Sequence, residues 1–317
     1  MDILLTGATG FVGNEIHARL LCENHAVRAA VRVVLPNEKF ENMPAVGDIN
    51  PTTTWSAVLN GASIVIHSAA RVHVMNDTAN DPLELFREVN TLGTLNLARQ
   101  AAAAGVKRFI FISSIKVSGE STDSQIPFKY SDVPSHEDPY GISKYEAEEG
   151  LKRIAAETGM EVVIIRPVLV YGPGVKGNFK SLVSFVKRGF PLPLGSINNK
   201  RSMVGLDNLV DLIITCIDHP KAANQTFLVS DDQDVSTTVL LRKMGQAFGK
   251  KVLLLPVPVS ALRFVGKIFG KSAEVDRLCG SLQVDIEHTK NTLNWKPPYT
   301  MEQQLSKIAA SYSNKED

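Results

Sequence analysis

Short apolar runs alternate with longer helical stretches over about the first 170 residues, and this alternation limits the possible folds more than any other feature. The runs are apolar throughout, which is typical of parallel strands that are covered on both faces of a sheet. We predict these strands at 3–5, 27–31, 64–66, 109–112 and 162–165. The stretches between them predict helices at 11–21, 82–104 and 140–158. Strands that alternate with helices imply right-handed crossovers, so the sequence predicts an α/β protein with a doubly wound parallel sheet.

The local composition changes after Tyr171, where glycine and proline become frequent. Such a loop-rich region is typical of a substrate-binding part. We therefore predict two domains, 1–171 and a smaller C-terminal substrate-binding domain over 172–317, with about 205–230 returning to the sheet. Within the second part we predict helices at 208–219, 238–248, 260–269 and 301–312, and strands at 227–229 and 252–255.

Composition excludes several classes of protein. The chain has 34 Lys and Arg against 33 Asp and Glu, and this balance argues against an electrostatic nucleic-acid binder. Its three cysteines are scattered without zinc-type spacing, which suits a reducing compartment and predicts no metal site. No basic segment precedes the first strand and no apolar run reaches the roughly 18 residues of a membrane span, so we expect a cytoplasmic protein without a membrane partner.

A glycine-rich loop separates the first strand from the first helix. Gly7, Gly10 and Gly13 recur at every third position, with Thr9, Phe11 and Val12 between them. Glycines at such a turn let the backbone approach a diphosphate, and the free amides at the start of the helix face its negative charge. An isolated loop of this kind is only a tight turn in about one case in three, but its place between strand and helix predicts a Rossmann-like dinucleotide-binding domain over 1–171.

The residues after the second strand bear on the choice of dinucleotide. An acidic residue that binds the ribose 2′-hydroxyl is expected there, and Arg32 stands in its place. An arginine can bind a 2′-phosphate, so the sequence favours NADP, with NAD as the alternative and a solvated surface arginine as the competing interpretation. Asp48, followed by Ile49, is placed to accept a hydrogen bond from the adenine amino group, although a turn or cap role is the ordinary one for Asp48.

Three further residues predict acid–base chemistry. Tyr140 and Lys144 stand at i and i+4, on one face of a predicted helix. An adjacent ammonium favours the phenolate and lowers a tyrosine pKa from its usual value of about 10. Ser114 follows the strand at 109–112 and so lies at the carboxyl edge of the predicted sheet. Doubly wound sheets bind their ligands at this edge. Chance also supplies a Tyr-x-x-x-Lys pair, so the order of glycine loop, strand-end serine and this pair carries the prediction.

The combined motifs resemble the extended short-chain dehydrogenase/reductase family, and more narrowly its nucleotide-sugar epimerase/dehydratase branch. The motifs are Thr6-Gly7-x-x-Gly10-Phe11-x-Gly13, His67-Ser68-Ala69-Ala70, Ser113-Ser114-x-x-Val117, Tyr140-x-x-x-Lys144 and Arg166-Pro167-x-x-x-Tyr171-Gly172-Pro173. The resemblance implies Ser114, Tyr140 and Lys144 as the catalytic set, with Lys144 also contacting the nicotinamide ribose. It implies further cofactor contacts from Ala69, Ala70, Pro167 and Val170. It implies a nucleotide diphosphate held by Asn178, Arg201 and Arg277, which without the family are an ordinary loop asparagine and two surface arginines.

Two departures from that family narrow the predicted activity. The 4,6-dehydratases of the branch carry an Asp-Glu pair where this chain has Ile115 and Lys116, so dehydration is disfavoured. Lys116 either binds a substrate phosphate or carboxylate or points to solvent. The epimerases of the branch carry an acidic residue where Arg32 stands. Similarity to O-antigen pathway proteins implies surface-polysaccharide precursor synthesis. Because exchangeable NADPH suits a reductase better than an epimerase, we predict a UDP-4-keto-sugar reductase. The alternatives are a UDP-glucose or UDP-N-acetylglucosamine 4-epimerase and a non-catalytic dinucleotide sensor.

The resemblance also predicts a homodimer. Members of the family commonly pair the helices that correspond to 82–104 and 140–158 in a four-helix bundle. The small side chains of Ala98, Ala101 and Ala102 predict a face that lets a second subunit approach closely.

Overall fold

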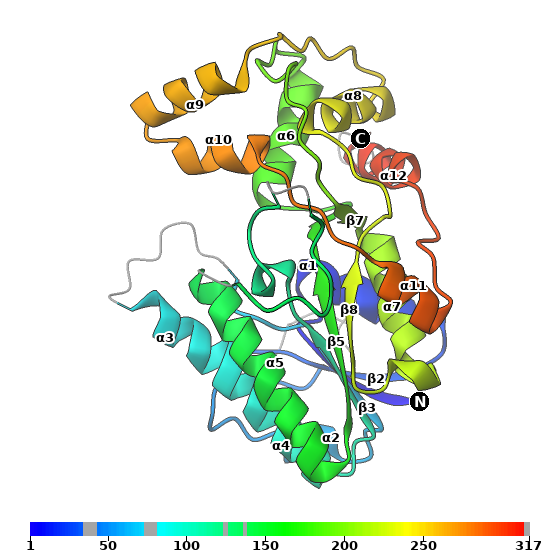
Figure 1. Ribbon diagram of the computed structural model, residues 1–317. Coiled ribbons are helices and arrows are strands. Elements are labelled where there is room, and N and C mark those ends of the chain that lie inside the picture. The colour runs from blue at the N-terminus through cyan, green and yellow to red at the C-terminus, as the bar shows by residue number, and fades with distance from the viewer. Residues whose placement is uncertain (34–42, 73–80, 123–125, 136–137, 314–317) are drawn as a thin grey trace.

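Six parallel strands form the central sheet of the computed structural model, which describes residues 1–33, 43–72, 81–122, 126–135 and 138–313 (Figure 1). The strands are β1 Asp2–Thr6, β2 Ala26–Ala30, β3 Ile64–His67, β4 Arg108–Ile112, β5 Glu161–Pro167 and β8 Gln225–Val229. Their order is β2-β1-β3-β4-β5-β8, and every adjacent pair is parallel. The predicted doubly wound, Rossmann-like sheet is therefore confirmed.

Helices cover both faces of this sheet. The side chains of Ile3 and Leu5 point to the face that carries α1 (Phe11–Cys22) and α7 (Leu206–Asp218). Leu4 points to the opposite face, against α4 (Thr94–Ala103) and α5 (Pro139–Thr158). Because successive side chains of a strand alternate between two covered faces, the strands are mainly apolar, with buried polar side chains such as His67 and Arg166 at a few positions. The short helix α2 (Ser56–Leu59) adds to the second layer.

The stretch 82–104 is helical as predicted, but the prediction of one regular helix is wrong. The stretch consists of α3 (Pro82–Phe86), a π-helical segment η2 (Arg87–Gly93) and α4. Within η2, Asn90 and Thr91 form hydrogen bonds to partners outside the helix, and such side-chain contacts accompany the wider π turn. Gly93 faces Ile49, where an added Cβ would lie 2.7 Å from Ile49 Cγ2. Tertiary contacts therefore override the regular helical winding that the sequence predicts.

The rest of the chain forms a second body beyond the carboxyl edge of the sheet, in the upper half of Figure 1. It contains a two-stranded parallel sheet and a core that includes Tyr171, Phe179 and Leu305. Its elements are β6 Leu169–Tyr171, β7 Met203–Gly205, α6 Gly177–Arg188, α8 Thr237–Ala247, α9 Val259–Ile268, α10 Ser272–Cys279 and α12 Met301–Ser313. α7 and β8 run back into the central sheet, with η4 (Pro220–Ala222) between them, and α11 (Glu287–Leu293) packs beside β8. The domain boundary at residue 171 stays a prediction.

The predicted strand at 252–255 is also wrong. Only Leu254 forms a bridge, to Leu192, and the side chains of Leu253 and Leu255 are exposed. Pro256 and Pro258 follow directly and cannot donate to a strand ladder, so the pairing stops there. The sequence prediction also missed α6, α10 and α11, because glycines or short lengths obscure their periodicity.

The alanine face predicted for dimer contact is not available to a second subunit. Ala98 and Ala101 are completely buried against the chain's own sheet, and only Ala102 is partly exposed. The small side chains let α4 approach the sheet closely instead. The homodimer itself stays a prediction.

Three further features concern the described ranges. No helix there is long and apolar enough to cross a bilayer. No group of three or more His, Cys, Asp or Glu in those ranges is placed to hold a metal ion. Cys22, Cys216 and Cys279 are free thiols.

A buried ion pair fastens α5 to the sheet. Arg166 on β5 donates to both carboxylate oxygens of Glu148 on α5, with Nη2 2.6 Å from Oε2. The Ser113 hydroxyl donates to the same carboxylate, and Arg166 Nη1 also donates to Ser118. These contacts satisfy the buried charges, so the carboxyl end of β4 and the helix α5 are held in one arrangement.

We expect Glu148→Ala to lower the free energy of unfolding by about 3–5 kcal/mol, because it leaves the buried Arg166 guanidinium unpaired. Glu149→Ala is the matched control on the same helix, since its exposed pair with Lys152 contributes about 0–1 kcal/mol. Urea denaturation of both variants measures the difference. Equal loss of stability in the two variants would show that the buried pair does not hold α5.

Candidate active site

The predicted site residues lie at the carboxyl edge of the sheet because all six strands are parallel. The chain passes from β1 to β2 on one side and then to β3 on the other, so the strand order reverses between β1 and β3. Doubly wound sheets bind ligands at such a point. The predicted cofactor residues gather around this edge: Gly7, Thr9, Gly10, Phe11, Val12 and Gly13 after β1, Ala69 and Ala70 after β3, and Pro167 and Val170 at β5 and β6.

The glycine loop is packed too closely for side chains. Gly7 has φ +76°, and an added Cβ would lie 2.7 Å from the backbone nitrogen of Ala69. A Cβ on Gly13 would lie 2.0 Å from the Gly7 carbonyl oxygen. The same oxygen accepts a hydrogen bond from the Gly10 amide at 2.8 Å. Gly10 caps α1 without a side-chain hydrogen bond, and Thr9 beside it is exposed. The amides of the first turn thus remain available to an anion, and the loop fits the diphosphate of a dinucleotide.

A hydrogen-bonded chain behind the loop joins β1, β3 and α4. Thr6 Oγ1 accepts from the Ala69 amide at 3.2 Å and lies 2.7 Å from His67 Nδ1. His67 Nε2 lies 2.9 Å from Thr94 Oγ1. Burial, with the nearby Lys144 ammonium, lowers the pKa of His67 to about 3, so this imidazole is neutral. Sequence analysis missed Thr6, His67 and Thr94 as a unit, because nothing in their spacing marks a contact across 27 or 61 residues.

Arg32 and Asp48 form an ion pair. Arg32 Nε lies 2.9 Å from Asp48 Oδ1, and both side chains are well exposed. The preference for NADP depended on an arginine with no acidic residue near it in the sequence. The fold places a carboxylate beside the guanidinium, and a 2′-phosphate would meet both charges.

Two contacts, one to the middle of α5 and one to its N-terminal cap, hold the segment that follows β4 against this helix. Ser113 is turned inward to Glu148, while Ser114 stays half-buried at the edge and accepts from the Lys116 amide at 3.2 Å. Lys116 Nζ lies 3.2 Å from Asp138, whose carboxylate caps α5. Ser114 and the helix that begins with Pro139-Tyr140 are therefore fixed relative to each other.

Tyr140 and Lys144 occupy adjacent turns of α5. The Tyr140 ring packs edge to face on Phe86, with 5.9 Å between the ring centres. Lys144 is 1% exposed, and its Nζ lies 4.2 Å from the centre of the Phe111 ring. This arrangement places a phenol and an ammonium in an apolar setting at the carboxyl edge of the sheet.

Burial changes the titration of both groups. Burial and then the Asp138 carboxylate raise the pKa of Tyr140 to about 12. Burial lowers the pKa of Lys144 to about 7, against the opposing effect of Glu148. The lowered tyrosine pKa that we expected from the lysine together with a nicotinamide ring stays a prediction, because in the protein chain by itself burial dominates and raises the pKa of Tyr140. At neutral pH the phenol keeps its proton.

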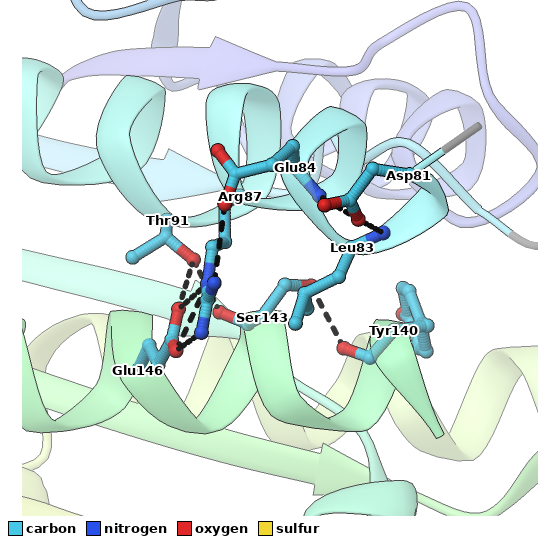
Figure 2. A network of polar contacts seen from close by, with 8 residues as sticks. All are labelled: Asp81, Leu83, Glu84, Arg87, Thr91, Tyr140, Ser143 and Glu146. Atoms are coloured by element: carbon cyan, nitrogen blue, oxygen red, sulfur yellow. Dashed lines mark hydrogen bonds and ion pairs between the residues drawn. The ribbon is translucent and has the colours of Figure 1, made fainter. Parts of the chain in front are cut away.

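Figure 2 shows the polar network that holds the first turns of α5 against η2. The Ser143 hydroxyl donates to the Tyr140 carbonyl at 2.8 Å, and Asn90 Nδ2 donates to the same hydroxyl at 3.1 Å. Thr91 Oγ1 donates to the Ser143 carbonyl at 2.8 Å. One turn further, Arg87 donates to the Glu146 carboxylate, with Nη2 2.6 Å from Oε1. The π-helical segment therefore positions the backbone that carries Tyr140, and no pattern in the sequence predicts this winding.

The predicted substrate residues divide into two groups. Arg201 and Arg277 come together, because Arg201 Nη1 donates to the Arg277 carbonyl at 2.6 Å. The Arg277 side chain is exposed on α10, whereas burial lowers the pKa of Arg201. Asn178 stands on another element, exposed in the first turn of α6. For Lys116 we predicted either a bond to a substrate phosphate or carboxylate or a side chain that points to solvent. In the structure its ammonium instead pairs with Glu120 and Asp138.

The fold and the glycine loop define a dinucleotide-binding enzyme of the Rossmann type. Residues 3–230 match the NAD dependent epimerase/dehydratase family, and the chain belongs to this family. It is 55% identical over 313 residues to the "UDP-glucose 4-epimerase" of Vibrio cholerae, a match that covers 98% of this chain and 95% of that protein.

Two solved structures share the fold across the whole chain. A short-chain dehydrogenase/reductase superfamily protein from Agrobacterium tumefaciens with bound NAD superposes with a TM-score of 0.78, at 22% identity over 99% of this chain and 98% of the other. A UDP-glucose 4-epimerase from Thermotoga maritima with UDP-glucose superposes with a TM-score of 0.77, at 20% identity over all of both chains. The predicted family, fold and enzyme class are confirmed, and a nicotinamide dinucleotide is the cofactor class.

We expect Lys144→Met to raise the free energy of unfolding at pH 7 by about 2–4 kcal/mol, because it removes a buried ammonium. Between pH 7 and about 10.5 the unfolded chain holds a proton on Lys144 that the folded chain has lost, so the native protein recovers stability as the pH rises. The difference in the free energy of unfolding between Lys144→Met and the native protein therefore becomes smaller towards pH 10.

Lys152→Met is the control for this substitution, since Lys152 is exposed on the same helix and should change stability by less than about 0.5 kcal/mol. Urea denaturation at pH 7 and pH 9.5 gives both comparisons. A gain that stays constant with pH would contradict the lowered pKa of Lys144.

Proposed function

We propose that the protein is a UDP-hexose 4-epimerase that interconverts UDP-glucose and UDP-galactose, or their N-acetyl counterparts. The 55% identity to the Vibrio cholerae "UDP-glucose 4-epimerase", over nearly the full length of both chains, carries this proposal. Ser114, Tyr140 and Lys144 at one sheet edge support it, and they disfavour a sensor that would need only the glycine loop. The reductase that we predicted from the sequence becomes the second candidate.

The ion pair between Arg32 and Asp48 also supports an epimerase. The reductase prediction followed from NADP, and the NADP preference followed from an unopposed Arg32. Because Asp48 pairs with Arg32, the pocket for a 2′-phosphate carries no net positive charge from these two residues. We propose NAD as the resident cofactor, cradled by the glycine loop and by the amides that follow it.

The proposed chemistry divides the work among three side chains. When bound, NAD supplies the hydride acceptor for C4 of the hexose and a positively charged ring. Ser114 and Tyr140 hold the C4 hydroxyl, and the Tyr140 oxygen takes the hydroxyl proton as C4 is oxidised to a ketone. Lys144 in its ammonium form lowers the pKa of Tyr140, and the positive ring acts in the same sense. Tyr140 would return its proton to the C4 oxygen and the hydride would return to C4 once the sugar has turned over, so the reaction has no net oxidation.

The second body holds the nucleotide in this proposal. Arg277 on α10 and Asn178 on α6 are exposed and bind the UDP diphosphate. Arg201 acts at one remove: its guanidinium donates to the carbonyls of Arg277 and Gly280, so it fixes the end of α10 and thereby positions Arg277. We place the reaction in the synthesis of surface-polysaccharide precursors.

One experiment separates epimerase from reductase. The purified protein is examined by mass spectrometry for retained cofactor, then incubated with UDP-glucose or UDP-N-acetylglucosamine without added reductant, and products are resolved by NMR. We expect retained NAD and formation of the galacto epimers with no net cofactor oxidation. Turnover of a UDP-4-keto sugar that requires added NADPH, with no epimer formed, would restore the reductase.

Tyr140→Phe tests the proton carrier. We expect turnover to fall by at least about a hundredfold while the fold and retained cofactor stay unchanged, because the phenol oxygen is the group that exchanges the proton. Tyr130→Phe is the control, since the Tyr130 ring stacks on His288 outside the catalytic set and should keep full turnover. Activity in the Tyr140 variant within a few-fold of the native rate would exclude the assignment.

A further inference from the structure

The helix α9 presents an apolar face to solvent. Phe264, Val265, Ile268 and Phe269 are 67%, 50%, 64% and 73% exposed. They stand at i, i+1, i+4 and i+5, so they share one side of the helix. A helix at a protein surface ordinarily turns such a stripe towards the core, and a contiguous exposed one marks an interface.

This exposure is not a failure of packing, because α9 is fixed on its other side. A Cβ on Gly266 would lie 2.7 Å from Val275 Cγ2, so α10 lies directly against α9 at that glycine. Arg263 on α9 also pairs with Asp276 on α10 at 3.0 Å. α10 is in turn held to the body, since Asn199 donates to the Gly280 carbonyl at 2.8 Å. The helical hairpin therefore holds the apolar face outward.

The hairpin stands at one end of the molecule. Figure 1 shows α9 at the top, with α10 between it and the central sheet. The segment that leads into α9 adds the exposed side chains of Leu253 and Leu255. Its backbone is hydrogen-bonded to that of Leu192, two residues after the exposed Phe190. The apolar face of α9, hereafter the α9 face, thus belongs to an apolar end of the protein.

The segment that contains α9 is rich in cations, of which Lys243, Arg263 and Lys271 pair with acidic residues from outside the segment: Glu302, Asp276 and Glu274. From residue 235 to residue 273 the sequence has seven Lys or Arg and no Asp or Glu, although the whole chain has a net charge of only +1. The seven are Arg242, Lys243, Lys250, Lys251, Arg263, Lys267 and Lys271. Lys250, Lys251 and Lys267 are exposed, and Lys267 lies one turn after Arg263 on the side of α9 next to the apolar face. An apolar face bordered by cations is typical of a helix that lies in the interface of an anionic membrane.

We propose that the α9 face binds the surface of an anionic phospholipid bilayer, with the axis of α9 parallel to the membrane plane. The apolar side chains enter the boundary between headgroups and acyl chains, and the lysines meet lipid phosphates. A second copy of the chain fits this face less well, because a symmetric contact would bring the two positive segments together. This mode of binding needs no membrane-spanning helix. In Figure 1, α10 lies between α9 and the sheet, so the sheet edge is not part of the proposed membrane contact.

Vesicle sedimentation tests the proposal on the full chain. We expect binding to vesicles of phosphatidylcholine mixed with phosphatidylglycerol, much weaker binding to phosphatidylcholine alone, and loss of binding as salt rises. The double substitution Phe264→Ser with Ile268→Ser should lower the affinity at least about tenfold, because two side chains no longer enter the apolar layer. Lys267→Gln should lower it about fivefold through the loss of one charge.

Leu21→Ser is the matched control, since it removes one exposed leucine from the end of α1 and should bind vesicles as the native protein does. Circular dichroism and turnover without vesicles should be the same for all variants, because none lies at the sheet edge. Native-like vesicle binding by the double variant would overturn the proposal. So would an absence of vesicle binding, including the case in which sedimentation shows self-association that the double variant abolishes. Vesicle binding is measured without substrate, so its result does not depend on the epimerase proposal.

Discussion

The common direction of the six strands is the constraint on which the site depends. It brings four strand ends to one edge, and each contributes a different part: the glycine loop after β1, Ala69 after β3, Ser114 after β4 and Pro167 in β5. Such convergence requires backbones to approach more closely than side chains permit, and the Gly7–Ala69 and Gly13–Gly7 contacts meet that requirement. The glycines are therefore needed for the chain's own backbone packing as much as for binding a ligand.

The sequence was most informative where structure is local or where burial imposes a pattern. The central strands were predictable because both their faces are covered, and the Tyr140–Lys144 pair because four residues make one helical turn. It was uninformative where partners are distant. Thr91 meets Ser143 across 52 residues, and Arg32 meets Asp48 only because the fold brings the residues after β2 together. The run at 252–255 looked buried but lies on the surface, since apolar composition alone does not say what covers a segment.

Lys144 shows how the site opposes the stability of the fold. An ammonium at 1% exposure costs free energy that an apolar side chain of the same length would not. The same desolvation brings its pKa to about 7, so a modest local field decides whether it is charged. The rigid support from Glu148, Arg166 and the η2 network keeps this unfavourable group in place.

The π-helical winding of η2 has a consequence for how related chains are compared. A π turn contains about one residue more than an α turn of similar rise. A relative that lacks one residue in 87–93 would therefore close into a continuous α-helix, with no loop needed to absorb the difference. Length changes ordinarily fall in surface loops, so an aligner would move that gap to the neighbouring loop and misregister every residue between. Asn90 and Thr91 would then be paired with the wrong positions, and their bonds to Ser143 would escape notice.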